Sequence, residues 1–499
     1  MFASRPRLTP VLDAVAVGLV ALVVYALHGF ASSLDRDQAT FVYGGREFAH
    51  GTPPYRGIFN SVGPLGDMTA GVAIRVGHLV GLDDVTGARL IYMLLSAACV
   101  AALSLLAREA LRSRTAAFIA PAAFLTFASF LTLATAGPRE KTVMVLCLEV
   151  ALLLLLRRRW FGAGVLTAVA TLTWQPVILP ALAAAAVAIV VSEGPRLRAA
   201  ASYVVGGVLP TVLMAGYFLA VGELQLAWWG FVTVNLGYKQ QPTILDSWGL
   251  LTSDYRTSLV VVVLGWVFAV ATGVVALVRR RSGDGNPDVE RALLVLGSGA
   301  LVAGLWSGYA INGGPDLFVV LPFAALGVAA AVDLARSRLS PTAGRRVAGA
   351  VVAVAVVYAG VEAVSTRDHR LPAERRDVTR MVAALPTGST LLSIYAPEVM
   401  VLAHRHNPYP WQLTESSIAP FLDDHLDGGL ASYADSIARR RPTLIAVGRH
   451  ATDGWLQPVL DQEYTRVGAG DHWAWWASNR LGPGRLRHLR EVNQAAWGG

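Results

Sequence analysis

The segment from Leu34 to Met68 reads LDRDQATFVYGGREFAHGTPPYRGIFNSVGPLGDM. It follows the first strongly apolar run of the chain, Val11 to Phe30, yet it contains a dense set of ionisable side chains. Ionisable groups beside hydrocarbon are costly unless they are solvated, paired or used. They also gather at functional sites. We therefore treat this segment as the first candidate active site.

The composition indicates a membrane protein with many spans. Hydrophobic residues make up 54% of the 499 residues, charged residues make up only 15%, and the mean hydropathy is +0.49. A single soluble domain is not this apolar, and a nucleic-acid partner is not expected. The two cysteines, Cys99 and Cys147, both lie in apolar runs, so we expect no disulfide.

We predict eleven membrane spans from the apolar segments. The first is read as an uncleaved span because it exceeds the h-region of a signal peptide, about 7 to 15 residues. Gln175-Pro176 and Pro180 interrupt residues 167–192, which form either one kinked span or two short ones, and we prefer two. The predicted spans are 11–30, 88–107, 115–134, 141–156, 161–176, 177–192, 200–221, 257–278, 291–310, 316–335 and 347–364.

The arginines of the connecting loops then fall on one side of the membrane. The positive-inside rule makes this side cytoplasmic, with the N-terminus in the cytoplasm and the C-terminal segment outside an integral plasma membrane. Segments 34–68, 136–141, 222–256 and 312–316 share the outer side. The arginines that define the cytoplasmic side are Arg5, Arg7, Arg108, Arg112, Arg114, Arg157 to Arg159, Arg196, Arg198, Arg279 to Arg281, Arg336, Arg338, Arg345 and Arg346.

The composition becomes that of a soluble domain after Arg367. β-like runs at 390–395, 443–447 and 472–477 alternate with helical patterns at 374–385, 397–405 and 430–441, which predicts a small α/β domain. We therefore divide the chain into a transmembrane domain, 1–364, with a catalytic outer loop at 32–68, and an extracytoplasmic α/β domain, 365–499. The Arg-rich tail from 482 to 499 is expected to be mobile.

Two interpretations of Asp37 are open. It is either a general base at the membrane surface or the N-cap of a helix that begins near Gln38, because aspartate accepts hydrogen bonds from the first backbone N–H groups of a helix. Asp35 and Asp37 also form an Asp-x-Asp pair that could hold a divalent cation such as Mg²⁺ or Mn²⁺. Such pairs are also common in loops without a metal.

Four cations of the outer segments are candidates for binding a lipid-linked phosphate through charge-assisted hydrogen bonds. Arg139 and Lys141 flank Glu140 at the mouth of the fourth span, where interfacial snorkelling is the alternative role. Lys239 and Arg256 flank a loop rich in tryptophan and tyrosine. Aromatic residues at such positions are usually interfacial anchors, although they also stack on sugar rings.

The first outer loop resembles that of a known superfamily. Three pieces carry the resemblance: Asp37-Gln38-Ala39-Thr40-Phe41-Val42-Tyr43 followed by Arg46, then Gly51-Thr52-Pro53-Pro54-Tyr55-Arg56, then Gly63-Pro64-Leu65. Together with the predicted spans they are similar to polyprenyl-phosphate-sugar glycosyltransferases of the GT-C superfamily, the relatives of protein mannosyltransferases and aminoarabinose transferases. The resemblance implies that Asp37 is the catalytic base. We predict that Asp35, Arg46, Tyr55 and Arg56 of the same loop bind substrate.

The loop departs from the family pattern at three places. Gln38 stands where the family has glutamate, Gly57 stands where it often has aspartate, and Val62 occupies the region of a family lysine. The cation that such a lysine would place on the donor phosphate must then come from elsewhere. Arg139 is our first choice, before Lys141, Lys239 and Arg256.

The expected function is that of an inverting glycosyltransferase, which moves a monosaccharide from a polyprenyl-phosphate donor to a glycan, lipid or protein of the cell envelope. One base suits this chemistry, because the acceptor hydroxyl loses a proton while the phosphate leaves as an anion that needs cations. A transporter or flippase of lipid-linked sugars is an alternative, for which intramembrane charge and inverted repeats would be expected. Neither is clear in the sequence, because Arg75 and Glu149 are more easily placed near a helix end or in a packed interior. A non-catalytic GT-C-like assembly partner is another alternative.

Overall fold

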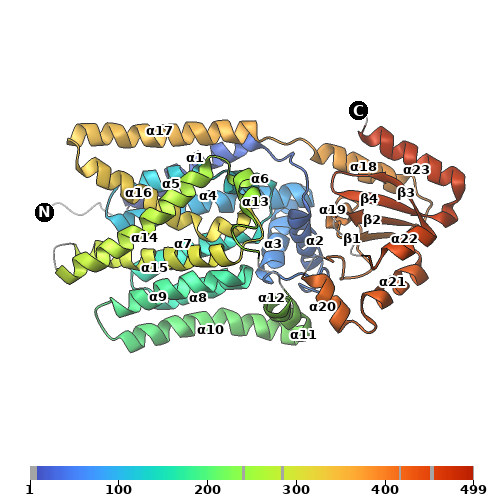
Figure 1. Ribbon diagram of the computed structural model, residues 1–499, viewed down its shortest axis with the longest axis horizontal. Coiled ribbons are helices and arrows are strands. Elements are labelled where there is room, and N and C mark those ends of the chain that lie inside the picture. The colour runs from blue at the N-terminus through green and yellow to red at the C-terminus, as the bar shows by residue number, and fades with distance from the viewer. Residues whose placement is uncertain (1–7, 239–241, 283–285, 415–416, 450–453, 498–499) are drawn as a thin grey trace. The chain divides into compact units, whose positions relative to one another are not determined.

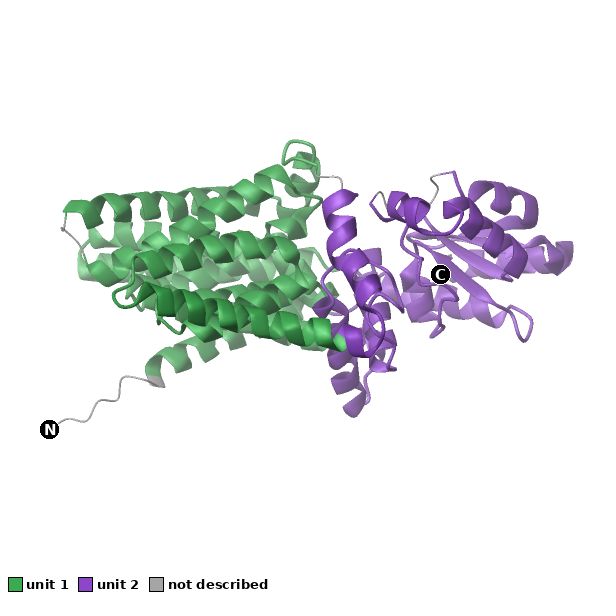
Figure 2. Ribbon diagram, turned by 90° about the horizontal axis from the view of Figure 1, so that it is seen from below, with its two compact units in different colours: residues 1–29, 89–217, 241–367 green, residues 30–88, 218–240, 368–499 purple. Residues whose placement is uncertain are grey.

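The computed structural model describes residues 8–238, 242–282, 286–414, 417–449 and 454–497, and it divides into two compact units (Figure 2). Unit 1 comprises residues 1–29, 89–217 and 241–367, and unit 2 comprises residues 30–88, 218–240 and 368–499. The predicted division at 364/365 grouped the outer loops with the membrane helices. The contacts within the chain instead group residues 30–88 with the C-terminal segment.

Unit 1 is helical, and each of the eleven predicted spans overlaps a helix (Figure 1). Among the described residues, six helices are long and apolar enough to cross a membrane, or seven if α5 and α6, which are bent by 72°, form one broken span. The helices that lie wholly or partly in unit 1 are α1 (Leu8–His28), α4 (Asp84–Leu111), α5 (Ala116–Leu125), α6 (Ala128–Ala136), α7 (Glu140–Leu156), α8 (Trp160–Thr173), η1 (Gln175–Val177), α9 (Ile178–Val190), α10 (Arg196–Ala220), α13 (Trp248–Tyr255), α14 (Ser258–Ser282), α15 (Pro287–Tyr309), η3 (Gly314–Val319), α16 (Leu321–Ser337) and α17 (Pro341–Ser365).

The outer surface of these helices is apolar. Leu213 on α10 is 64% exposed and Val357 on α17 is 65% exposed, and both have many apolar neighbours on the same surfaces. Large contiguous apolar surfaces of this kind are rare on monomers in water, but they match the hydrocarbon of a bilayer. The fold class predicted from composition, a helical protein with many membrane spans, is therefore confirmed.

Small residues allow the helices of unit 1 to approach closely. A Cβ atom added at Gly297 of α15 would lie 2.7 Å from the Cα atom of Gly273 of α14, so neither position admits a side chain without a shift of the helices. Membrane helices commonly associate through such glycines, because they have no hydrophobic driving force toward one another. Cys99 and Cys147 are buried on α4 and α7 as free thiols.

The interruption at Gln175-Pro176 separates two helices that run in opposite directions. Arg158, just before α8, has its guanidinium 3.7 Å from the carboxylate of Glu193, just after α9. The start of α8 and the end of α9 therefore lie at the same end of unit 1. This arrangement agrees with two short helices rather than one kinked helix.

The arginine-rich connections meet at one end of unit 1. Arg108 and Arg114, which flank the α4–α5 turn, both bind Asp13 near the start of α1. Further contacts link the α7–α8, α9–α10, α14–α15 and α16–α17 turns to this end: Arg157 with Glu109, Arg112 with Asp288, Arg158 with Glu193, Arg280 with Val191 and Ser113 with Asp333. The charge pattern predicted that these arginine-rich turns lie on the same side, and within unit 1 they do share one end.

Unit 2 begins with α2 (Arg36–Ala49) and α3 (Leu65–Leu79), which pack against each other. The helix that was expected to begin near Gln38 exists, and all of its residues from Gln38 to Glu47 are buried, because α3 covers one side and α19 covers another. Residues 218–240 contribute α11 (Leu224–Trp228), η2 (Trp229–Thr233) and α12 (Val234–Gly237). Helix α2 is therefore a central element of unit 2 rather than a surface element.

The C-terminal segment forms an α/β domain around a four-stranded sheet of order β1-β2-β4-β3 (Figure 1). Strand β1 (Leu391–Ile394) is parallel to β2 (Leu444–Gly448), whereas β4 (Trp473–Ser478) is antiparallel to both β2 and β3 (Tyr464–Ala469). The helices are α18 (Leu371–Ala383), α19 (Pro397–Leu402), α20 (Ile418–His425), α21 (Gly429–Arg440), α22 (Gln457–Glu463), η4 (Asn479–Leu481) and α23 (Gly482–Trp497). All three predicted strands and all three predicted helices are found.

The expectation that the tail would be mobile is wrong for residues 482–497. These residues form α23, which packs on α18 and β3. Its buried residues, Leu489, Asn493 and Ala496, are spaced four and three apart and therefore lie on one face of the helix. Residues 498–499 lie outside the described residues.

Candidate active site

The N-terminus of α2 carries the two aspartates that the sequence singled out. The helix begins at Arg36, so Asp35 is the N-cap residue and Asp37 is the second helical residue. The interpretation of Asp37 as the N-cap is therefore wrong. The side chain of Asp35 makes no capping hydrogen bond either, and lies instead 3.0 Å from Nε2 of His472.

Asp37 lies beside an arginine that is itself held in place. Oδ1 of Asp37 accepts hydrogen bonds from Nε and Nη2 of Arg36 at 3.2 and 2.9 Å. The guanidinium of Arg36 lies over the ring of Tyr395, 4.4 Å from its centroid, and also contacts the Tyr395 hydroxyl. Although most of α2 is buried, the Asp37 side chain is 43% exposed. Asp37 is thus an oriented and accessible carboxylate.

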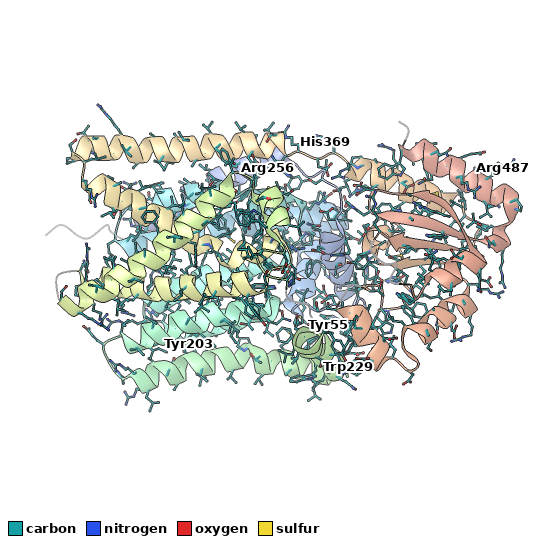
Figure 3. The ribbon with its side chains drawn as sticks, in the orientation of Figure 1. Tyr55, Tyr203, Trp229, Arg256, His369 and Arg487 are labelled. Carbon is teal, nitrogen blue, oxygen red and sulfur yellow. The ribbon has the colours of Figure 1, made fainter. Side chains whose placement is uncertain are left out.

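Arg46 and Tyr55 are buried and form hydrogen bonds to the backbone of unit 2. The Arg46 guanidinium donates to the carbonyls of Met400 and Arg405 at 3.0 and 2.5 Å. The Tyr55 hydroxyl donates to the Val62 carbonyl at 2.7 Å, and its ring packs against Phe59 and Phe218. Figure 3 labels Tyr55. These contacts show how the loop is held, and the assignment of both residues to substrate binding stays a prediction.

Arg56 and Gly57 follow directly. The Arg56 side chain is 62% exposed and pairs with Glu223 at 2.9 Å. A Cβ atom at Gly57 would lie 2.7 Å from Cβ of Glu47, so a larger residue does not fit there without a shift. The departure from the family pattern at Gly57 therefore has a packing reason in this chain.

Four acidic residues and one histidine form a group next to the N-terminus of α2, which we call the acidic cluster. Its members are Asp35, Glu374, Glu398, Asp471 and His472. His472, in the β3–β4 turn, has Nε2 3.0 Å from Asp35 and 3.4 Å from Asp471. The Asp35 carboxylate raises the pKa of His472 against the opposing effect of burial. Asp471 also binds Arg370 at 2.8 Å.

Two glutamates of the acidic cluster are completely buried. Glu374 on α18 accepts a hydrogen bond from the backbone N–H of Leu34 at 2.9 Å. Glu398 on α19 makes no hydrogen bond of good geometry through either carboxylate oxygen among the described residues. Burial raises the pKa of Glu398 to about 8, although its own backbone N–H and His472 favour the charged form.

One part of the acidic cluster has the geometry of a metal site. Glu374, Asp471 and His472 each offer one ligand atom, and these atoms lie within 4.8 Å of one another. The sequence paired Asp35 with Asp37 for this role, but the described contacts turn Asp35 toward His472 and Asp37 toward Arg36. No spacing in the sequence pointed to Glu374, Glu398 or His472. The one feature of these residues that the sequence shows is that Asp471 and His472 are consecutive.

In unit 1, Arg139 and Lys141 lie in a buried ionic group. Lys141 Nζ is 2.8 Å from the carboxylate of Asp316 and 3.2 Å from that of Glu140, and 5.4 Å from the centre of the Trp174 ring. Arg139 is the N-cap residue of α7, and its Nε is 3.7 Å from Glu140. Lys141 is therefore balanced by two carboxylates of its own chain.

The remaining predicted cations differ in their surroundings. Arg256, labelled in Figure 3, follows α13 with a φ of 51° and pairs with Glu362 at 3.2 Å, while its side chain stays 54% exposed. Lys239 lies outside the described residues. Asp37 belongs to unit 2, whereas Arg139, Lys141 and Arg256 belong to unit 1.

Comparison with known proteins was informative only at the level of structure. No protein-family model matches the sequence, and no match was found among curated proteins. The fold is similar to that of ArnT from Cupriavidus metallidurans bound to undecaprenyl phosphate, with a TM-score of 0.65, 14% identity, and coverage of 93% of this chain and 97% of ArnT. The apo state of the same ArnT gives a TM-score of 0.61 at 14% identity, covering 94% and 98%.

A third similar structure is the apo oligosaccharyltransferase from Archaeoglobus fulgidus, with a TM-score of 0.50, 14% identity, and coverage of 93% of this chain and 74% of that one. These similarities cover nearly the whole chain and identify its architecture. The chain is an integral membrane protein with a GT-C fold, and the resemblance seen in its first outer loop is confirmed at the level of the fold.

Proposed function

We propose that this protein is an inverting glycosyltransferase of GT-C type, which moves a monosaccharide from a polyprenyl-phosphate donor to an acceptor of the cell envelope. The observation that supports this most is the state of Asp37. It is an exposed carboxylate, held by Arg36, on a helix whose other residues are mostly buried. The fold shared with ArnT, which is seen bound to undecaprenyl phosphate, supports the choice of a lipid-linked donor.

In this proposal Asp37 accepts the proton of the acceptor hydroxyl as that oxygen attacks the anomeric carbon. The bond from the anomeric carbon to the phosphate oxygen breaks at the same time, and polyprenyl phosphate leaves as an anion. No second, acidic carboxyl is required, because the phosphate needs positive charge rather than a proton. Arg139 is our first choice for that charge, and Arg256 and Lys239 follow, since Lys141 is already balanced.

We further propose that the reaction takes place on the outer side of the membrane, with the N-terminus in the cytoplasm. The arginine-rich turns that meet at one end of unit 1 support this orientation through the positive-inside rule. The same rule then assigns the C-terminal α/β domain to the outside.

The test is Asp37→Asn in proteoliposomes supplied with a labelled polyprenyl-phosphate sugar. Asparagine keeps the size of the side chain but does not accept a proton at neutral pH, so we expect turnover to fall by about two to four orders of magnitude while folding is unchanged. Asp427→Asn, at an exposed aspartate of the same unit, serves as the matched control. Near-parental turnover of Asp37→Asn would contradict the proposal, and a larger loss from Asp35→Asn would make Asp35 the base.

A further inference from the structure

The acidic cluster of unit 2 combines the ligand types that transition metals prefer. His472 offers an imidazole nitrogen, and Glu374 and Asp471 offer carboxylate oxygens, all within 4.8 Å of one another. Zn²⁺ and Mn²⁺ accept such a mixed set, whereas Ca²⁺ and Mg²⁺ prefer oxygen ligands alone. The chemistry of the side chains therefore favours a divalent transition metal over an alkaline-earth ion.

Asp35 adds a further carboxylate from a distant part of the chain. Its Oδ1 lies 3.0 Å from Nε2 of His472, and Oδ2 of Asp471 lies 3.4 Å from that same nitrogen. Two carboxylates thus converge on one atom that can itself bind a metal in the neutral imidazole form. A cation placed among them would replace a proton on His472.

Glu398 is an independent observation that points to a cation. It is 0% exposed, and neither of its carboxylate oxygens makes a hydrogen bond of good geometry with the described residues. Helix α19, which carries Glu398, packs against α18, which carries Glu374 of the same cluster. A carboxyl group like that of Glu398 is costly to ionise while it is buried, and a nearby cation favours its charged form.

The arginines near the acidic cluster are engaged by other carboxylates as well. Arg370 is shared between Asp368 at 3.0 Å and Asp471 at 2.8 Å, and Arg36 binds Asp37 at 2.9 Å. The competing explanation for the cluster is that protonated His472, together with Arg370 on Asp471, supplies the positive charge. That explanation leaves the carboxylate oxygens of Glu398 without a hydrogen bond of good geometry among the described residues, whereas a metal ion adds positive charge beside them.

We propose that Glu374, Asp471 and His472 bind one divalent transition-metal ion of the Zn²⁺ or Mn²⁺ type, with Asp35 as the fourth ligand and Glu398 as a carboxylate behind the ligands. The ion joins three chain segments of unit 2: the residue before α2, helix α18 and the β3–β4 turn. It thereby fixes the N-terminus of α2, which carries Asp37. The role is that of a positioning ion, and no step of sugar transfer passes through it.

The experiment uses the full chain purified in detergent and stripped with a chelator, then titrated with ZnCl₂ and separately with MnCl₂. We expect one ion per chain by elemental analysis and calorimetry. His472→Ala and Asp471→Asn should each abolish this binding, and Glu398→Gln should weaken it about 10- to 100-fold, as expected for groups behind metal ligands. His488→Ala, at an exposed histidine on α23, is the matched control and should bind like the parent.

Three results would overturn the proposal. If neither metal binds at millimolar concentration, His472 is only a charged partner of Asp35 and Asp471. If binding survives His472→Ala and Asp471→Asn, the ion lies elsewhere. If Asp37→Asn abolishes binding while His472→Gln retains it, the ion belongs to the Asp35–Asp37 pair. Since no donor or acceptor is present, none of these results depends on whether the protein transfers sugars.

Discussion

In unit 1 the buried carboxylates of Glu140 and Asp316 lie 3.2 and 2.8 Å from Lys141, whereas in unit 2 the buried carboxylate of Glu398 has no hydrogen bond of good geometry among the described residues. Both groups are withdrawn from water, and a buried charge must be matched by a partner. Around Lys141 the matching charge comes from side chains of unit 1 itself, although Glu149 of the same helix is also buried without a hydrogen bond among the described residues. In our proposal, the acidic cluster of unit 2 takes its matching positive charge from a metal ion in solution.

This difference also separates structural from functional charges. A cation matched by two carboxylates, such as Lys141, has little attraction left for a phosphate. An exposed carboxylate such as Asp37, whose described ion pair is with the neighbouring Arg36, stays accessible to a substrate. Burial and pairing therefore rank the predicted site residues in a way that residue type alone does not.

The largest effect is expected from Lys141→Met. The substitution removes the cation between Glu140 and Asp316 and leaves two buried carboxylates, so stability should fall by about 3 to 5 kcal/mol. Thermal unfolding of the purified protein in detergent measures the loss. Adding Asp316→Asn to this variant should recover part of it. A parental unfolding temperature combined with weaker use of the donor would instead make Lys141 a phosphate ligand.

A smaller effect is expected from Asp377→Ala, which sharpens the comparison within unit 2. Asp377 is fully buried like Glu398, but it accepts hydrogen bonds from Trp475 Nε1 at 2.9 Å and from Asn493 Nδ2 at 2.8 Å. Its removal takes the acceptor from the buried Trp475 N–H and one of the two acceptors from the Asn493 amide, which still donates to the Ala469 carbonyl, and should cost about 2 to 4 kcal/mol in thermal unfolding.

The matched variant is Glu398→Leu in the metal-free protein. It removes a buried carboxylate that has no such donors, so it should be neutral or stabilising. Equal losses of stability in Asp377→Ala and Glu398→Leu would show that the hydrogen bonds of Asp377 do not make it more stabilising than Glu398.

The smallest effect is expected from Arg256→Gln. The Arg256 side chain is 54% exposed and its pair with Glu362 is screened by solvent, so we expect a change in stability below about 1 kcal/mol. The donor affinity of this variant, measured with the labelled lipid in proteoliposomes, is the informative quantity. Unchanged affinity would remove Arg256 from the candidates for the donor phosphate.

The sequence predicted the long helices of unit 1 and most of the C-terminal domain, because both depend on local patterns. It did not predict α13, or the 72° bend that divides the span at 115–134 into α5 and α6. It missed β3, whose sequence from Tyr464 to Ala469 contains Arg466 and Gly468 and does not alternate cleanly between apolar and polar residues. It also missed α23, because the arginines and glycines at its start suggested a mobile tail. One buried face stabilises the helix, but its few buried residues did not form a recognisable amphipathic pattern in the sequence.

The acidic cluster could not be predicted in the same way. Asp35 and His472 are more than four hundred positions apart, and Glu374 and Glu398 lie in helices where a glutamate is ordinarily exposed. Their meeting is a property of the tertiary fold. Asp37, in contrast, was found from sequence because its neighbours along the chain form one continuous motif.

The discontinuous construction of unit 2 also has a consequence for biosynthesis. Arg46 on α2 donates its hydrogen bonds to carbonyls of Met400 and Arg405, the former 354 positions later in the chain. Because a ribosome adds roughly 5 to 20 residues per second, about 20 to 70 s pass between the synthesis of these partners. During that interval the loop that bears Asp37 has left the ribosome without the segment that surrounds α2. The candidate catalytic base is therefore made well before the residues that surround its helix.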